Sequence, residues 1–264
     1  MLDVGCGKGY MAFKLAPFLG DTANIYGIDS EPNWIREANN RTQLYTNNLD
    51  KEFIFKVGDS YDLPFESNLM DLTVCQTLLI HLSTPEKAIA EMIRVTKPGH
   101  NIIAFEPNNR INSLIMNNLN EIDEKYETMM RKVDSALRVE LGKKSINEGL
   151  NSLGDIIHEF FYRAGFKNVR VWISDKAATL IPSYDTEEKQ AIRDEIIHWM
   201  EYNEANYDYD KNLKYYLAGG GKECDFLLFW QEQEQRKQRD LSLLREGRYI
   251  SSGGVLFYII VGTK

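Results

Sequence analysis

Several features that would place this chain in a specialised class of proteins are missing from it. Its only cysteines, Cys6, Cys75 and Cys224, are scattered and form no C-x-x-C pair. They predict reduced thiols rather than a disulfide framework or a zinc site. The chain opens directly on a strand-like stretch rather than a signal peptide, and no apolar run reaches the roughly 20 residues of a membrane helix. We therefore expect a cytoplasmic protein without metal ligands or a membrane partner.

Positive charge is also in short supply. The 264 residues include 31 Lys and Arg against 39 Asp and Glu, which gives a net charge of -8. Because nucleic-acid binding depends heavily on Lys and Arg contacts to phosphates, this balance argues against a broad nucleic-acid surface, although a local basic groove is compatible with it. The chain is long enough to bury a large core, either as one elaborated domain or as a domain with a cap.

Glycine is concentrated near the start of the chain, in the sequence L-D-V-G-C-G-K-G-Y of residues 2–10. The stretch reads as the end of a buried strand, a glycine turn and a helix that begins near Lys8. Glycines accept positive φ values and let a ligand approach the backbone closely, and the N–H groups of a helix N-terminus favour a negatively charged group. Asp3 can accept a hydrogen bond from an amino group. Donors together with a carboxylate suit a zwitterionic amino-acid moiety better than a bare phosphate.

Acidic residues follow the next two strand-like stretches. Asp29 ends the stretch 24–28, about 20 residues beyond the glycines, where nucleotide-binding sheets place an acid on ribose hydroxyls; the alternative is a helix N-cap. Asp59 follows the stretch 53–57 and could equally be an ordinary turn aspartate. The glycine spacing is not that of a dinucleotide fingerprint, G-x-G-x-x-G, because position 10 is Tyr.

The pattern D-x-G-x-G-x-G at residues 3–9 resembles motif I of the class I S-adenosylmethionine (SAM) methyltransferases. Residues 81–99 include H-L-S and then E-M-I-R-V-T-K-P-G, which closely resembles the "H-L … E-x-x-R-V-L-K-P-G" segment of that family. This second segment is far more specific than the glycines alone. The resemblance covers residues 1–108 well, with 150–175 and 254–262 as supporting elements.

The resemblance implies SAM as the cofactor and S-adenosylhomocysteine as the product. It places the glycines beside the methionine moiety, Asp3 on its amino group, Asp29 on the ribose, and Asp59 with Ser60 on the adenine. The cofactor-binding residues that we predict are Asp3, Gly5, Cys6, Gly7, Gly9, Asp29, Ser30, Asp59, Ser60, Gln76 and Thr77.

The fold that the resemblance implies is α/β and Rossmann-like, a seven-stranded, mostly parallel sheet with an antiparallel last strand and helical insertions that form a cap. We assign residues 1–178 and 248–264 to the SAM-binding domain, with 109–150 as a helical insertion and 179–247 as a helical cap insertion. The insertion at 109–150 follows the fifth strand and would lie over the carboxyl edge of the sheet, where open α/β sheets bind ligands.

Methyl transfer from a sulfonium is an in-line displacement, so the enzyme mainly has to align the reactants and exclude water. A base is needed only if the acceptor must lose a proton. His81 is the candidate, because the unperturbed pKa of histidine is near neutrality; the alternative is a ring that packs on its loop. For acceptor contact we predict Glu106 and Asn108, and the aromatic Trp199 and Tyr202, which could instead fill the core of the cap.

The sequence therefore predicts a SAM-dependent methyltransferase that acts on a small molecule. A non-catalytic SAM-binding or interaction protein is the alternative, because family members usually carry a helical segment before motif I and here the first strand starts with Met1. An oxidoreductase on a nucleotide-binding sheet is a third reading, against which Tyr10 counts. The acceptor atom and the oligomeric state stay open.

Overall fold

The computed structural model describes the chain from residue 1 to 264, except for residues 47–50, 116–124, 175–176, 178 and 203–207. The described residues divide into two compact units. The first comprises Met1–Asn108, Ser152–Ile173 and Phe257–Lys264, and the second comprises Asn109–Asn151 and Ser174–Leu256. The stretches predicted as two separate insertions, 109–150 and 179–247, thus fall within one unit.

A seven-stranded sheet with the order β3-β2-β1-β4-β5-β7-β6 forms the centre of the first unit. The neighbours from β3 to β5 are parallel, whereas β7 runs antiparallel to both β5 and β6. The predicted α/β fold with an antiparallel last strand is therefore confirmed. The strands are β1 (Leu2–Val4), β2 (Asn24–Asp29), β3 (Glu52–Val57), β4 (Met70–Gln76), β5 (Thr96–Pro107), β6 (Lys167–Ile173) and β7 (Phe257–Thr263).

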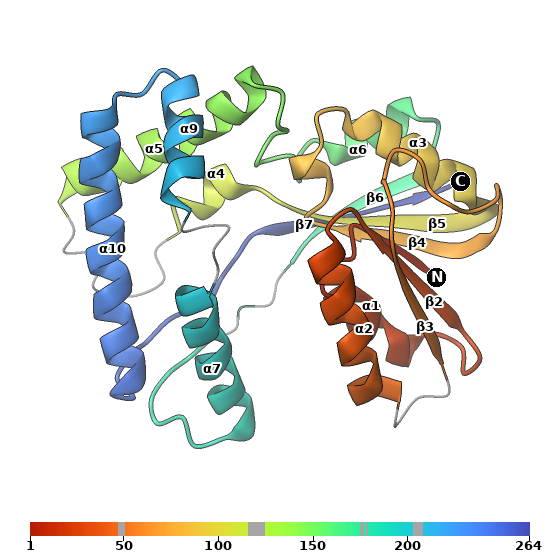
Figure 1. Ribbon diagram of the computed structural model, residues 1–264, viewed down its shortest axis with the longest axis horizontal. Coiled ribbons are helices and arrows are strands. Elements are labelled where there is room, and N and C mark those ends of the chain that lie inside the picture. Colours follow the sequence, from red (N-terminus) through yellow and green to blue (C-terminus); the bar gives the residue numbers. More distant parts are fainter. Residues whose placement is uncertain (47–50, 116–124, 175–176, 178, 203–207) are drawn as a thin grey trace. The chain divides into compact units, whose positions relative to one another are not determined.

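Helices cover both faces of this sheet (Figure 1). One face carries α1 (Tyr10–Leu15) and α2 (Pro32–Thr46), and the other carries α3 (Pro85–Val95) and α6 (Ile157–Arg163). After Leu15 the chain continues as a short 3-10 helix, η1 (Ala16–Phe18). Pro17 accounts for this change, because proline has no N–H to donate and its ring disrupts an α-helix interior.

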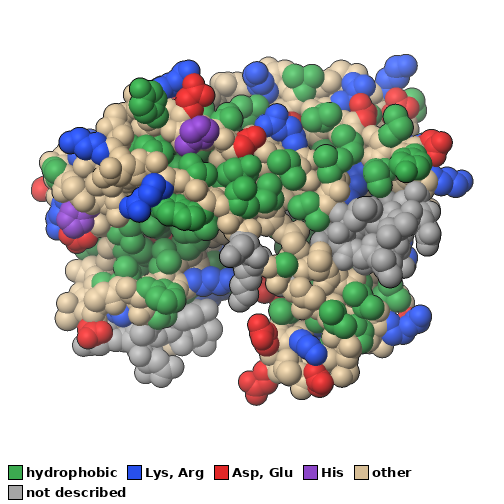
Figure 2. All heavy atoms as spheres, turned by 180° about the vertical axis from the view of Figure 1, so that it is seen from behind, with side chains coloured by type: hydrophobic (Ala, Val, Ile, Leu, Met, Phe, Trp, Pro, Cys, Tyr) green, Lys and Arg blue, Asp and Glu red, His purple; other side chains and the backbone are tan. Residues whose placement is uncertain are grey.

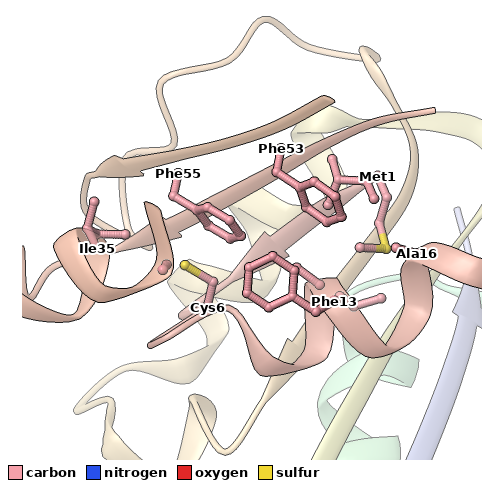
Figure 3. Packing of buried hydrophobic residues seen from close by; sticks show 11 residues of the cluster. Met1, Cys6, Phe13, Ala16, Ile35, Phe53 and Phe55 are labelled. Carbon is pink, nitrogen blue, oxygen red and sulfur yellow. The ribbon is translucent and has the colours of Figure 1, made fainter. Parts of the chain in front are cut away.

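The glycine bend after β1 rests on an aromatic part of the core (Figure 3). The ring of Phe13, on α1, lies 5.1 Å from the ring of Phe53 and 5.5 Å from that of Phe55, centroid to centroid. The ring of Phe55 in turn covers Gly27 of β2, where an added Cβ would lie 2.4 Å from it. The strands that carry the candidate residues are therefore held by close packing, which tolerates little change in side-chain volume.

The second unit is helical over most of its described residues. It contains α4 (Asn109–Asn112), α5 (Tyr126–Ser145), α7 (Glu187–Tyr202), α9 (Tyr209–Ala218) and α10 (Glu223–Arg245). Two glycines allow α5 and α9 to meet closely. A Cβ added at Gly142 would lie 1.8 Å from the carbonyl oxygen of Tyr215, and one added at Gly219 would lie 2.0 Å from that of Arg138.

On the described part of the face shown in Figure 2, Lys and Arg side chains are scattered among Asp and Glu side chains. They do not gather there into one broad basic area. Among the helices that the structure describes, none combines the length and the apolar character needed to cross a bilayer.

Replacement of Gly142 by alanine tests the α5–α9 contact. We expect Gly142→Ala to lower the free energy of unfolding by about 2 kcal/mol, because the overlap outweighs the roughly 1 kcal/mol that alanine gains in helix propensity. Urea denaturation followed by circular dichroism measures the change. Gly20→Ala is the control, since a Cβ at Gly20 meets nothing within 4 Å. Equal stability of Gly142→Ala and the unaltered protein would contradict the close approach.

Candidate functional site

The glycine bend is tied to the end of β2 by backbone hydrogen bonds. The amides of Gly5 and Cys6 both donate to the carbonyl oxygen of Ile28, at 2.7 and 3.0 Å. The amide of Gly7 donates to Oδ2 of Asp29 at 2.8 Å. These N–H groups, which the sequence suggested as donors to a ligand, are therefore already used inside the protein. What the bend can offer a ligand is therefore its shape rather than the N–H groups of Gly5, Cys6 and Gly7.

The three glycines of the bend have positive φ values of 70°, 51° and 83° at Gly5, Gly7 and Gly9. Each φ value suits glycine, but the surroundings differ. A Cβ at Gly5 would lie 2.7 Å from the side chain of Leu78, and one at Gly9 would lie 2.7 Å from Phe13. At Gly7 the nearest atom is 3.9 Å away. Gly7 is therefore the position of the bend where a ligand can approach the backbone.

Asp3 is the least satisfied polar residue of this region. Its side chain lies in β1, is 1% exposed, and neither carboxylate oxygen has a hydrogen-bond partner. Burial raises the pKa of Asp3 to about 8, and the charge of Asp29 adds to this rise. The backbone amide of Ala12 partly opposes it, although this amide does not reach hydrogen-bond geometry with either oxygen. Buried polar atoms normally have partners. A ligand with a cationic group would supply the hydrogen-bond partner that the Asp3 carboxylate lacks.

Asp29, at the end of β2, accepts two hydrogen bonds within the protein, and its carboxylate can accept further ones. Oδ1 accepts from the amide of Glu31 at 2.9 Å, and Oδ2 accepts from the amide of Gly7. A carboxylate oxygen has two lone pairs, so each can accept one further hydrogen bond. Ser30 follows it and is exposed. The Asp29 side chain therefore shapes the bend and can also accept from a ribose hydroxyl.

Asp59 and Ser60 follow β3 after the single residue Gly58. Val57, the last residue of β3, is in register with Asp29 of β2. The Asp59 side chain is exposed, and its Oδ1 accepts from the amide of Tyr61 at 2.8 Å, which makes it a turn residue. Asp3, Asp29 and Asp59 thus lie at the carboxyl ends of three adjacent strands. Their roles toward amino group, ribose and adenine stay predictions.

The chain after β4 is strained at Thr77, which has a φ of 52° although it is β-branched. Its amide donates to the carbonyl oxygen of Phe105 at 2.9 Å. Positive φ at such a residue is costly and is often found at functional sites. Gln76, the last residue of β4, is exposed. The structure thus brings both predicted residues to the same edge of the sheet as Asp3.

Glu106 holds this segment in place. Its side chain is fully buried, and Oε1 accepts from the amides of Leu78 and Leu79 at 2.9 and 2.8 Å. Burial raises its pKa to about 7, and the same amides oppose that rise. Leu78 packs on Gly5. Glu106 therefore braces the glycine bend through Leu78, a role that no sequence motif indicated.

The remaining predicted residues lie in different surroundings. His81 ends the 3-10 helix η2 (Leu79–His81) and is exposed. Asn108 is 2% exposed and pairs through its backbone with Ser152. Trp199 and Tyr202 are 46% and 67% exposed on α7, in the second unit. Their catalytic or acceptor-binding roles stay predictions.

The two cysteines of the first unit are buried, whereas Cys224 is exposed. Cys6 and Cys75 are buried, and burial raises the pKa of both thiols, so they stay protonated at neutral pH. Throughout the described ranges, no three His, Cys, Asp or Glu side chains are grouped so as to hold a metal ion.

Comparisons with known proteins agree with this geometry. The model of a methyltransferase domain family matches residues 1–165, more than half of the chain. The sterol 24-C-methyltransferase erg6 of Schizosaccharomyces pombe is 35% identical over 99 residues, which are 38% of this chain and 25% of that protein. The chloroplastic 2-phytyl-1,4-beta-naphthoquinone methyltransferase of Arabidopsis thaliana is 29% identical over 170 residues, 64% of each chain. This chain therefore spans less than two thirds of either relative.

A solved structure supports the fold. The [4+2]-cyclase SpnF has a TM-score of 0.52 and 19% identity, and the similarity covers 100% of this chain and 73% of that one. At this identity the likeness concerns the fold alone.

The described residues fit the cofactor of the matched family. Asp3 offers a buried carboxylate without a partner for the ammonium of the methionine moiety, and Gly7 leaves space beside the backbone. Asp29 retains acceptor positions at the next strand. With the family model covering residues 1–165, the chain belongs to the class I SAM-dependent methyltransferases.

Proposed function

We propose that this protein transfers the methyl group of SAM to a small-molecule acceptor by in-line displacement. The observation that carries the proposal is the buried, unpartnered carboxylate of Asp3, on the strand that leads into the bend where Gly7 leaves space beside the backbone. Bound SAM supplies a methyl group on a sulfonium, which is already electrophilic. The task left to the protein is to bind, to orient and to exclude water, and orientation alone can be worth roughly 7–11 kcal/mol.

Each acid at the strand ends has a distinct task in this proposal. Asp3 accepts from the ammonium of the methionine moiety, and Asp29 accepts from the ribose hydroxyls while it holds Gly7. Asp59 and Ser60 lie where the adenine would be bound. Glu106 keeps Leu78 against Gly5 and so positions the bend through its Oε1. Its Oε2 is buried without a hydrogen-bond partner, and we retain the acceptor as the predicted contact of Glu106.

The acceptor is a small, partly apolar molecule. The names of the two relatives refer to a sterol and to a naphthoquinone, both largely apolar compounds. The net charge of -8 disfavours a nucleic-acid substrate. The rings of Trp199 and Tyr202 would make apolar contacts with the acceptor, and their N–H and O–H groups could form hydrogen bonds. His81 would accept a proton if the acceptor has to lose one.

The binding of S-adenosylhomocysteine should depend on pH through Asp3. The pKa of about 8 in the free protein falls when an ammonium lies beside the carboxylate, so binding releases a proton below pH 8. Affinity should therefore rise with pH by up to about tenfold per unit between roughly pH 5.5 and 7, where the ligand amine stays protonated. Titration calorimetry measures this slope.

Asp3→Asn should flatten that slope and lower the affinity at neutral pH by about tenfold, since a charged hydrogen bond contributes roughly 1.5–3 kcal/mol. Asp21→Asn, at an exposed turn, is the matched control and should keep the full slope. A slope that persists in folded Asp3→Asn would assign the titration to another group.

Asp29→Ala should weaken the binding of SAM about tenfold or more, because the variant loses both the acceptor for the ribose and the anchor of Gly7. Asp21→Ala removes a carboxylate of the same kind from an exposed position and should leave the affinity unchanged. Unchanged affinity in a folded Asp29→Ala protein would remove the ribose assignment.

Transfer itself is tested with methyl-labelled SAM and separate pools of cellular metabolites, protein and RNA. We expect the label in the metabolite pool with formation of S-adenosylhomocysteine, and about tenfold less with Asp29→Ala when SAM is well below its dissociation constant. Label in RNA or protein would contradict the small-molecule acceptor. Tight SAM binding without transfer to any pool would favour the non-catalytic alternative.

A further inference from the structure

Two charged residues of α3, Glu91 and Arg94, have no role in the proposed function, although they belong to the segment that most specifically indicated the family. Both contact the backbone that follows the turn of residues 59–62. Arg94 donates from Nη1 to the carbonyl oxygen of Phe65 at 2.7 Å and from Nη2 to that of Leu63 at 2.9 Å. Oε2 of Glu91 accepts from the amide of Leu63 at 2.8 Å. The end of the turn is therefore fastened to α3.

Glu91 and Arg94 also hold each other in place. Nε and Nη2 of Arg94 donate to Oε1 and Oε2 of Glu91, each at 2.7 Å. The hydrogen bond from Arg94 lowers the pKa of Glu91 below its ordinary value, so this carboxylate is charged at neutral pH. Such two-pronged, charge-assisted pairs are stronger and more specific in geometry than single hydrogen bonds. The guanidinium thus joins one carboxylate and two backbone carbonyls in a fixed arrangement.

The turn of residues 59–62 is fastened at two further points. Just before it, the amide of Gly58 donates to the carbonyl oxygen of Asp29 at 3.0 Å. Within it, the hydroxyl of Tyr61 accepts from the amide of Thr84 at 3.1 Å. Because both ends of this short segment and one of its side chains are held, little conformational freedom is left to it.

We propose that Glu91, Arg94 and Tyr61 are positioning residues for the recognition of adenine. They hold the turn of residues 59–62 in the conformation in which the Asp59 carboxylate accepts from the exocyclic amino group. They act through the backbone of the turn rather than by touching the ligand. This inference rests on the proposed function, because it requires that the adenine of SAM is bound at this turn.

Two ligands measure how well the amino group is recognised. They are S-adenosylhomocysteine and its purine analogue, which has hydrogen in place of that amino group. In titration calorimetry the unaltered protein should bind S-adenosylhomocysteine about tenfold more tightly, because the analogue cannot donate to the Asp59 carboxylate. Equal affinity for the two ligands would overturn the positioning role alone. No binding of either ligand would refute the proposed function and this inference with it.

Arg94→Gln should lower this ratio of affinities from about tenfold to about threefold or less, since the end of the turn is released. Arg94→Lys should have the same effect, because an ammonium group cannot reproduce the fork of the guanidinium. A purely structural role would weaken both ligands in proportion and keep the ratio. An unchanged ratio in an Arg94→Gln protein that is folded by circular dichroism would overturn the proposal.

Tyr61→Phe tests the second fastening and is the variant to use if neither Arg94 variant folds. It removes only the hydroxyl group, which accepts from the amide of Thr84. The ratio of affinities should fall at least about twofold, since the turn loses one of its hydrogen bonds. If this is the only variant that folds, an unchanged ratio in it overturns the proposal by itself.

Arg163→Gln is the matched control in the same unit. It removes the ion pair that Arg163 forms with Glu159 along the exposed side of α6, far in sequence from the turn. This variant should keep the ratio of about tenfold, because an exposed ion pair of this kind contributes little and holds no loop. A ratio that falls as far in Arg163→Gln as in Arg94→Gln would contradict a specific role of Arg94.

Discussion

The structure of the candidate site depends on how the bend after β1 is fastened to the neighbouring strand. The amides of Gly5 and Cys6 share the carbonyl of Ile28, and the amide of Gly7 uses the carboxylate of Asp29. With these donors satisfied internally, the bend has a defined shape before any ligand binds. Such preorganisation reduces the entropy that binding would otherwise cost.

A second brace acts from the other side of β1. Glu106, at the end of β5, accepts from the amides of Leu78 and Leu79, and Leu78 packs on Gly5. Glycine at position 5 is therefore required by packing as much as by its φ. Between these two fastenings lies Asp3, whose carboxyl group has no hydrogen-bond partner in the protein. The rigidity of the surroundings prevents Asp3 from finding one by local rearrangement.

Much of the first unit could be predicted from the sequence, because it depends on local signals. The strand patterns and the resemblance to a known family led to a mostly parallel seven-stranded sheet with an antiparallel last strand. The glycine spacing and an acid at each early strand led to Asp3, Asp29 and Asp59. The use of the bend's amides could not be predicted, since it depends on Ile28 and Asp29 more than 20 residues away. The role of Glu106 likewise arises from contacts between distant segments, for which no motif exists.

The antiparallel last strand has a consequence for synthesis on the ribosome. β7 lies between β5 and β6 in the sheet, yet it follows the whole second unit in the chain. Until residues 257–263 have emerged, β5 has an open edge and β6 has no neighbour in the described sheet. An unpaired strand edge can form hydrogen bonds with strands of other chains and so promote aggregation. The nascent protein therefore has to keep β5 apart from other strands while more than 80 residues of the helical unit are translated.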